Sequence, residues 1–148
     1  MIEQFQVLQR ILEGDVATMT ALRTTLANAR LRLFKAGFAP NYDTTLANLA
    51  ANECDYTGYA ALTLTWSAVG IGGDGLPQII SNRSFFQATD AVTPNTVGGW
   101  FLDTGGMGPV GLGYGVMDPT VPMTVALAFL AMVVNISADG KVTASVET

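Results

Sequence analysis

The spacing of hydrophobic residues along this chain changes near residue 30. Before that point, six apolar residues recur at intervals of three, four or seven: Phe5, Leu8, Leu12, Met19, Leu22 and Leu26. This is the periodicity of an amphipathic helix. Because Gly14 is typical of a helix end and Asp15 of the N-cap of a following helix, the pattern predicts an N-terminal helical arm over residues 1–29.

The apolar stripe of the arm has two interpretations. It would suit a trimeric coiled coil, but Gly14 and Asp15 interrupt the heptads. An amphipathic helix that lies on its own domain, or on a neighbouring chain, is therefore favoured.

Alternation replaces the helical spacing from residue 30 onward. Leucine alternates with the basic residues of this segment, which are Arg30, Arg32 and Lys35. A period of two predicts a half-exposed strand, which the proline at residue 40 ends. Residues 44–52 are predicted to form one or two helical turns.

The rest of the chain consists of short apolar runs separated by Gly, Pro, Asn and Asp. They cover residues 60–68, 77–81, 84–88, 96–103, 110–117, 121–136 and 141–147. Strands at this spacing predict a mainly β fold, an antiparallel β-sandwich or a jelly-roll-like barrel. The run 121–136 is expected to form one long central strand, and residues 138–141 a hairpin turn. We therefore expect one β-sandwich domain over residues 30–148, preceded by the helical arm.

Charged residues are scarce in these 148 residues, at 13%, whereas 49% are hydrophobic. Such a chain often hides surface in an assembly, so we expect a homo-oligomer. The net charge of −5 is uneven: five basic residues face three acids through residue 37, and nine acids face Arg83 and Lys141 in the remainder. The acidic body argues against binding to nucleic acid. The basic stretch 23–35 could contact an acidic partner.

The residue types that catalysis and metal binding use most are also scarce. The chain has no histidine, and Cys54 is its single cysteine. The commonest general base, an internal disulfide and a cysteine-rich zinc site are thereby excluded. We predict no catalytic residue, no metal site and no cofactor. The longest apolar run, residues 121–134, is shorter than the roughly 20 residues of a membrane helix, so no membrane partner is expected.

Gly70, Gly72 and Gly75 match the G-x-G-x-x-G fingerprint of a dinucleotide-binding turn. That turn needs a following helix, whose N-terminus binds the pyrophosphate. Here residues 78–84 have no helical stripe and favour a strand. The segment is therefore interpreted as a β-connection with its turn at Asp74-Gly75, which contacts a neighbouring subunit more readily than a phosphate.

Asp74, Asp103 and Asp118 are the acids that could serve a glycoside hydrolase, which needs two carboxylates across a cleft. Each lies in or next to a predicted turn, where aspartate is favoured because it hydrogen-bonds the local backbone. Turn formation is the preferred interpretation.

Eight glycines between residues 98 and 115 surround Trp100, Phe101, Met107 and Tyr114. Such an apolar, glycine-rich surface suits close packing between subunits. Together with the helical arm and the basic strand, it supplies the expected interface residues. These are Phe5, Leu8, Leu12, Arg30, Arg32, Lys35, Trp100, Phe101 and Tyr114.

Four segments in this order resemble a family of small virion structural proteins of tailed phages: EQFQVLQRILEGD, LRLFKAGFAP, TTLANLAANECDYTGYAALTLTW and VGGWFLDTGG. The residues that carry the family pattern are Leu31, Leu33, Phe34, Pro40, Leu46, Leu49, Tyr56, Gly58, Tyr59, Ala60, Thr65 and Trp66. The resemblance covers residues 3–103. The chain departs from the pattern at Lys35-Ala36, where the family has Asn-Asn, and at Asp55-Tyr56, where it has Asp-Phe.

The resemblance implies a non-enzymatic bacteriophage structural protein. The leading hypothesis is a capsid decoration or cement protein, made in the host cytoplasm, that bridges capsomers on the exterior of the virion. Its partners would be the major capsid protein and copies of itself, and a homotrimer would suit local threefold positions. The alternative is a tail, fibre or baseplate component that binds host surface glycans through exposed aromatic residues. A small glycan hydrolase is a third hypothesis.

Overall fold

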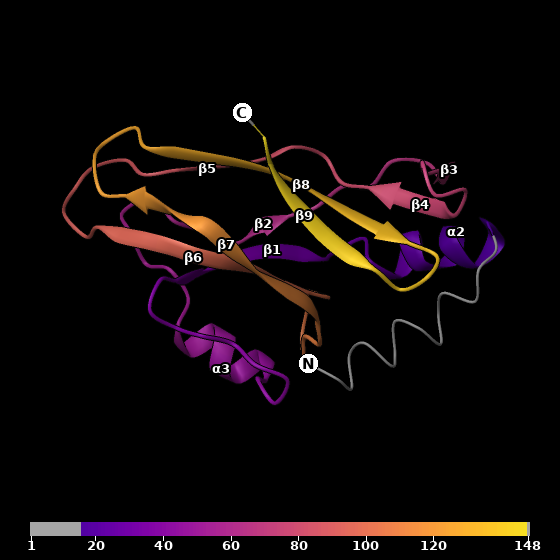
Figure 1. The fold of residues 1–148 in the computed structure, drawn as a ribbon, viewed down its shortest axis with the longest axis horizontal. Coiled ribbons are helices and arrows are strands. Elements are labelled where there is room, and N and C mark those ends of the chain that lie inside the picture. Colours follow the sequence, from indigo (N-terminus) through magenta and orange to yellow (C-terminus); the bar gives the residue numbers. More distant parts are fainter. Residues whose placement is uncertain (1–15, 148) are drawn as a thin grey trace.

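The structure, a computed structural model, describes residues 16–147, which form two helices and nine strands (Figure 1). The elements are α2 Val16–Thr25, β1 Arg30–Lys35, α3 Leu46–Ala51, β2 Leu62–Thr63, β3 Gly70–Ile71, β4 Pro77–Ile80, β5 Ser84–Gln87, β6 Asn95–Asp103, β7 Gly111–Met123, β8 Phe129–Ser137 and β9 Val142–Glu147. Neither helix has the length and hydropathy that spanning a membrane requires.

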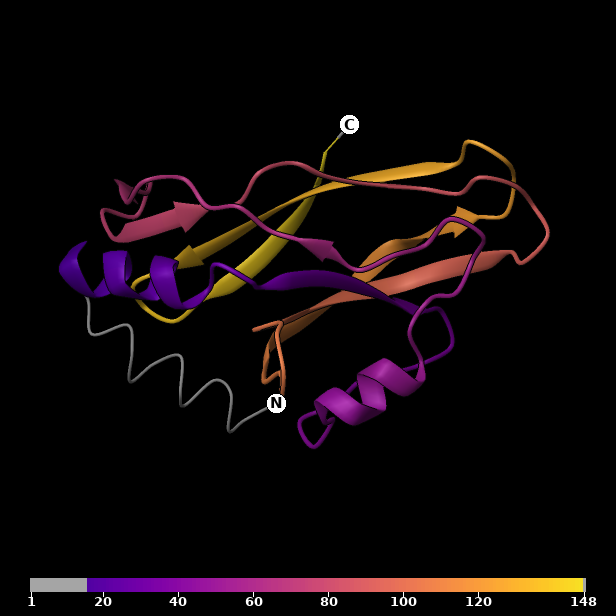
Figure 2. The ribbon, with the colours of Figure 1, turned by 180° about the vertical axis from the view of Figure 1, so that it is seen from behind.

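Two antiparallel sheets pack face to face as a β-sandwich, which confirms the predicted fold class. The first sheet has the order β2-β1-β6-β7. The second has the order β3-β4-β8-β5, and β9 pairs with the remaining side of β8. The second sheet lies above the first in Figure 1, and Figure 2 shows the same two layers from behind.

The main core lies between the two sheets and is built from alternate strand positions. Leu31 and Leu33 enter it from β1, as their alternation predicts. Met132, Val134 and Ile136 face them from β8 in the other sheet. Strand alternation, with one face buried, therefore sets the register of both layers.

Helix α2 belongs to this same core. Met19, Leu22 and Leu26 are buried in it, at the spacing that the sequence predicts. The indole N–H of Trp66 donates to the carbonyl oxygen of Leu26 at 3.0 Å and fixes the end of the helix to the sandwich. The part of the predicted arm from Met19 to Ala29 therefore packs on its own domain.

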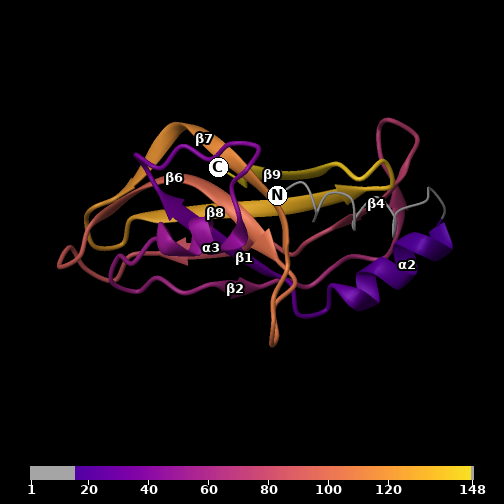
Figure 3. The same ribbon diagram turned by 90° about the horizontal axis from the view of Figure 1, so that it is seen from below.

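Helix α3 lies on the outer face of the first sheet, below β1 and β6 in Figure 1 and in front of them in Figure 3. Its N-terminus is a capping box, in which the Asn48 N–H donates to the Thr45 hydroxyl at 3.1 Å and the Asn48 side chain accepts from the Thr45 N–H. Leu49 packs against Phe34 and Phe101 in a second, smaller cluster. The predicted helical turns in residues 44–52 are thus confirmed.

The prediction of one long strand over residues 121–136 is wrong. Strand β7 ends at Met123 and β8 begins at Phe129, with a turn between them. Leu127 takes the left-handed conformation of this turn, at φ 66°, where glycine or asparagine is usual. The turn at residues 138–141 is where the sequence predicts it, with Gly140 at φ 83°.

Candidate interaction surfaces

The outer face of the first sheet carries a cluster of two arginines and two carboxylates. Arg30 donates from Nε and Nη2 to the two carboxylate oxygens of Asp103, at 3.1 and 2.9 Å. Arg32 donates from Nη1 to Asp103 at 2.8 Å and forms a two-point ion pair with Glu53. The register of β1 against β6 sets Arg30 opposite Asp103. Paired contacts of this kind fix geometry as well as charge.

Burial of the cluster strengthens its internal contacts. The Asp103 side chain is fully buried. Burial raises the pKa of its carboxyl, but hydrogen bonds from Arg30, Arg32 and the Gly105 N–H outweigh this effect and hold the pKa below its ordinary value. The hydrogen bond to Glu53 raises the pKa of the Arg32 guanidinium against the opposing effect of burial. Asp103 and Arg32 are therefore both charged at neutral pH.

These ion pairs change the interpretation of the basic strand. Arg30 and Arg32 are neutralised by Asp103 and Glu53. Lys35, the third cation expected to meet a partner, lies with its Nζ 3.0 Å from the Asp55 carboxylate. Each of the three thus faces a carboxylate of its own chain, and the strand does not present a free positive surface.

The predicted interface aromatics also make contacts within the chain. Trp100 is 6% exposed and Phe101 is fully buried. The Arg32 guanidinium lies 4.8 Å from the centre of the Phe101 ring, a cation–π distance. Tyr114 is half-buried and its hydroxyl donates to the Asn41 carbonyl oxygen at 3.0 Å. The remaining expected interface residues, Phe5, Leu8 and Leu12, lie outside the described part of the chain.

The glycines of residues 98–115 allow close packing inside the chain. A methyl group at Gly99 would overlap the ring of Phe34, and one at Gly115 would overlap the indole of Trp100. The strands β6 and β7 can therefore bring these rings against their backbones. The loop 104–110 differs, because Met107 within it is fully exposed.

The G-x-G-x-x-G segment is a β-hairpin between β3 and β4. The Leu76 N–H donates to the Asp74 carboxylate at 3.0 Å, and Gly75 has φ 80°. The turn at Asp74-Gly75 is thus confirmed. Strand β4 stands where a dinucleotide-binding helix would have to begin.

Cys54 is buried, and burial raises the pKa of its thiol to about 12. The thiol is therefore protonated at neutral pH and is a poor nucleophile. Within residues 16–147, no three His, Cys, Asp or Glu side chains lie together as a group that could hold a metal ion.

A cleft of about 330 Å³, which we call the edge cleft, opens between β7 and β9. The residues that line it include Trp100, Met117, Asp118, Met132, Ala144 and Val146. Strand β7 bulges here, because its register against β6 shifts between Val97 and Gly99. Among the described strands, β7 pairs only with β6 and β9 only with β8, so an open strand edge borders the cleft on each side.

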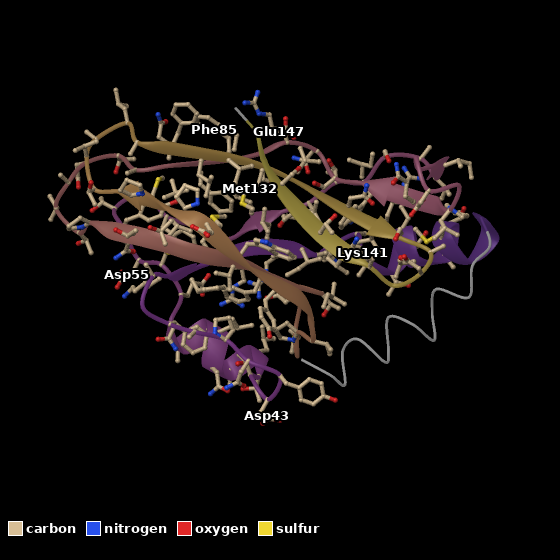
Figure 4. The ribbon with its side chains drawn as sticks, in the orientation of Figure 1. Asp43, Asp55, Phe85, Met132, Lys141 and Glu147 are labelled. Carbon is tan, nitrogen blue, oxygen red and sulfur yellow. The ribbon has the colours of Figure 1, made fainter. Side chains whose placement is uncertain are left out.

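A second apolar surface lies on the outer side of the second sheet. The rings of Phe85 on β5 and Phe129 on β8 stack with their centroids 5.3 Å apart, yet each is at least half exposed. Ala131, which its neighbours bury, and the half-buried Val133 follow at alternate positions of β8. Figure 4 shows Phe85 pointing away from the sandwich, whereas Met132 points between the sheets. We call Phe85, Phe129, Ala131 and Val133 the aromatic face.

The aromatic face adjoins an apolar end of the molecule. Loops 88–94 and 124–128 lie side by side there (Figures 1 and 2), and the Leu127 N–H donates to the Ala88 carbonyl oxygen at 2.9 Å. Val92, Val125 and Leu127 are 61 to 80% exposed. Together with Phe85 and Phe129, these exposed side chains make this end of the sandwich a candidate binding surface.

Comparison of the chain with protein-family models, with curated proteins and with solved structures finds no match. The fold and its surfaces define a small antiparallel β-sandwich with an internal ion-pair cluster, an aromatic face and an edge cleft.

Proposed function

We propose that this chain is a non-enzymatic structural protein of a tailed phage, a decoration or cement protein that bridges capsomers on the outside of the head. One structural observation carries the proposal: large apolar side chains lie exposed over the aromatic face, over the adjoining end and at the rim of the edge cleft. Monomeric proteins rarely expose large contiguous apolar patches, so side chains exposed in this way favour a surface that binds another molecule. A cement protein buries such surface against shell proteins and stabilises the shell by mass action.

The resemblance to phage virion proteins supports the same function, because the residues that carry it hold the fold together. Residues that carry the pattern, such as Leu31, Phe34, Leu49 and Trp66, lie in the two cores. They hold β1, α3 and the strand after them in place. A shared scaffold leaves the exposed surfaces free to differ, so the binding surface is identified from exposure and not from the pattern.

The proposal is tested with heads of the phage that carries this chain, prepared with and without it. Heads without the chain should release their DNA at a lower temperature, and added purified chain should restore the higher temperature. The reason is that a protein that binds the intact shell, and not the disrupted one, shifts the equilibrium toward the intact shell. Chain that does not sediment with the heads would contradict the proposal. So would turnover of a polysaccharide that the Asp74→Asn substitution abolishes.

The alternative function is a tail, fibre or baseplate component that binds host surface glycans. The stacked and exposed rings of Phe85 and Phe129 favour it, because they offer a flat apolar platform. Binding of labelled chain to host cells, competed by free glycans and reduced by the Phe85→Ser substitution, would select this alternative. A decoration protein gives no such binding.

A further inference from the structure

We propose that the aromatic face is a self-association surface, through which two copies of this chain form a twofold dimer. The inference goes beyond the proposed function. A chain with no role on a phage head can dimerise, and a decoration protein can bind a shell as a monomer, so the two proposals can fail separately.

The strand register arranges the aromatic face in rows. Phe85 on β5, Ala131 on β8 and Glu147 on β9 form one row across three strands. Val133 lies in the next row. Ser81 bonds to Val134 and Ser84 pairs with Met132, which leaves Asn82 and Arg83 opposite Val133, and both are exposed. The centre of the face is therefore apolar, with Arg83 on one border and Glu147 on the opposite one. Figure 4 shows Phe85 and Glu147 together on this outer side.

The two border charges lack an ion-pair partner in the part of the chain that the structure describes. Arg83 and Glu147 are both exposed, and neither forms an ion pair within residues 16–147. The three cations of β1 each form an ion pair with a carboxylate of their own chain. Arg83 forms none within residues 16–147, so its guanidinium is available to pair with a second chain.

Twofold symmetry makes these charges complementary. When two aromatic faces meet about an axis that runs along β8, the β5 border of one copy lies over the β9 border of the other. Arg83 then approaches Glu147 of the partner subunit, one row away, a distance of about 7 Å along the strand that long side chains can span. The pair occurs twice in the dimer. A second copy of the chain therefore matches the face in both its apolar centre and its border charges.

The size of the face predicts a reversible dimer. Strand β8 has nine residues, which corresponds to about 30 Å, and three strands give a width of about 15 Å. The outer surface of β8 and the strands beside it thus covers roughly 450 Å² per copy, which is an upper bound for the aromatic face and below the ~800 Å² per partner of a standard interface. We expect a dissociation constant in the micromolar range.

Analytical ultracentrifugation of the whole chain over low micromolar to millimolar concentrations tests the dimer. The apparent mass should rise from the chain mass of 15.5 kDa to twice that value. The Phe129→Ser substitution should weaken association at least tenfold, because it removes an exposed ring from β8, the strand along which the twofold axis runs. Val116→Ser is the matched control: its side chain is 66% exposed against 56% for Phe129, but it lies on β7 of the other sheet. It should leave the association unchanged.

Charge exchange tests the twofold geometry separately from the apolar centre. Arg83→Glu and Glu147→Arg should each weaken the dimer several-fold at low salt, and the double variant should restore it. A chain that is monomeric at every concentration would overturn the proposal, as would a mass that converges on three chains or a dimer indifferent to Phe129→Ser. Monomers whose Phe129→Ser variant loses binding to phage heads would assign the face to the shell protein and also overturn it.

Discussion

Asp103 joins separate parts of the chain through one carboxylate. It accepts hydrogen bonds from Arg30 and Arg32 on β1 and, at 2.8 Å, from the Gly105 N–H of the following loop. If its charge is removed, two guanidinium groups share the single carboxylate of Glu53 in a largely buried cluster. The uncompensated positive charge lowers the free energy of unfolding. Asp103→Asn should lower the free energy of unfolding by about 3 kcal/mol at pH 7, measured by urea denaturation.

The same carboxylate predicts how stability depends on pH. Its pKa is lowered in the folded state and near its ordinary value of 3.8 in the unfolded chain. Its contribution to stability is therefore complete above about pH 5 and is lost as the pH falls through the lowered pKa. Urea midpoints measured from pH 6 to pH 2 should fall less steeply in Asp103→Asn than in the native chain. Parallel curves would show that Asp103 is not the group responsible.

Two neighbouring tyrosines provide a matched pair of substitutions. The Tyr59 hydroxyl donates to Glu53 and accepts the Leu33 N–H at 3.1 Å, whereas the buried Tyr56 hydroxyl makes no hydrogen bond within residues 16–147. Tyr59→Phe should lower the free energy of unfolding by about 1–3 kcal/mol, because the buried Leu33 N–H and the Glu53 carboxylate each lose a hydrogen-bond partner. Tyr56→Phe should leave stability unchanged or slightly raised. Equal losses in denaturation experiments would contradict this assignment.

At the scale of elements, glycine sets the close approach of β6 and β7 to aromatic rings. A methyl group at Gly99 would overlap the Phe34 ring and the backbone of β7, whereas one at Gly113 would meet Val142 at an ordinary 3.5 Å. Gly99→Ala should therefore destabilise the sandwich by roughly 2–3 kcal/mol through overpacking. Gly113→Ala is the control and should be nearly neutral. Similar thermal midpoints for the two variants would refute the packing explanation.

Elements with a strong local signal were predictable from the sequence. The alternation of Leu31 and Leu33 with arginines predicted β1, and the 3–4 spacing of Met19, Leu22 and Leu26 predicted the buried stripe of α2. The turn between β7 and β8, which carries the chain from the first sheet to the second, was not, because residues 124–128 contain no Gly, Asn, Asp or Pro. Tertiary contacts hold Leu127 in a conformation that its own residue type disfavours.

The interaction surfaces were only partly predictable, because they depend on contacts distant in sequence. Alternation placed Arg30 and Arg32 on one face of β1, but their carboxylates come from residues 53 and 103. Phe85 and Phe129 fell within predicted apolar runs, and their stacking depends on the pairing of β5 with β8. The outward alternation of Phe85 against Phe86 was the available signal for the aromatic face.

At the scale of the whole molecule, the two sheets differ in what covers them. Helix α3 packs on the outer face of the first sheet, while no element within residues 16–147 covers the outer face of the second (Figure 1). The aromatic face is on that uncovered sheet, and the edge cleft opens at the side where β7 and β9 end the two layers. This asymmetry suits a protein whose first sheet is covered by its own helix α3 and whose second sheet is covered by a partner.

Electron cryomicroscopy of phage particles with and without this chain tests its role on the head most directly. The proposed function predicts difference density on the head lattice, at the joints between capsomers, into which the β-sandwich fits. Difference density confined to the tail, or particles that do not differ, would contradict it.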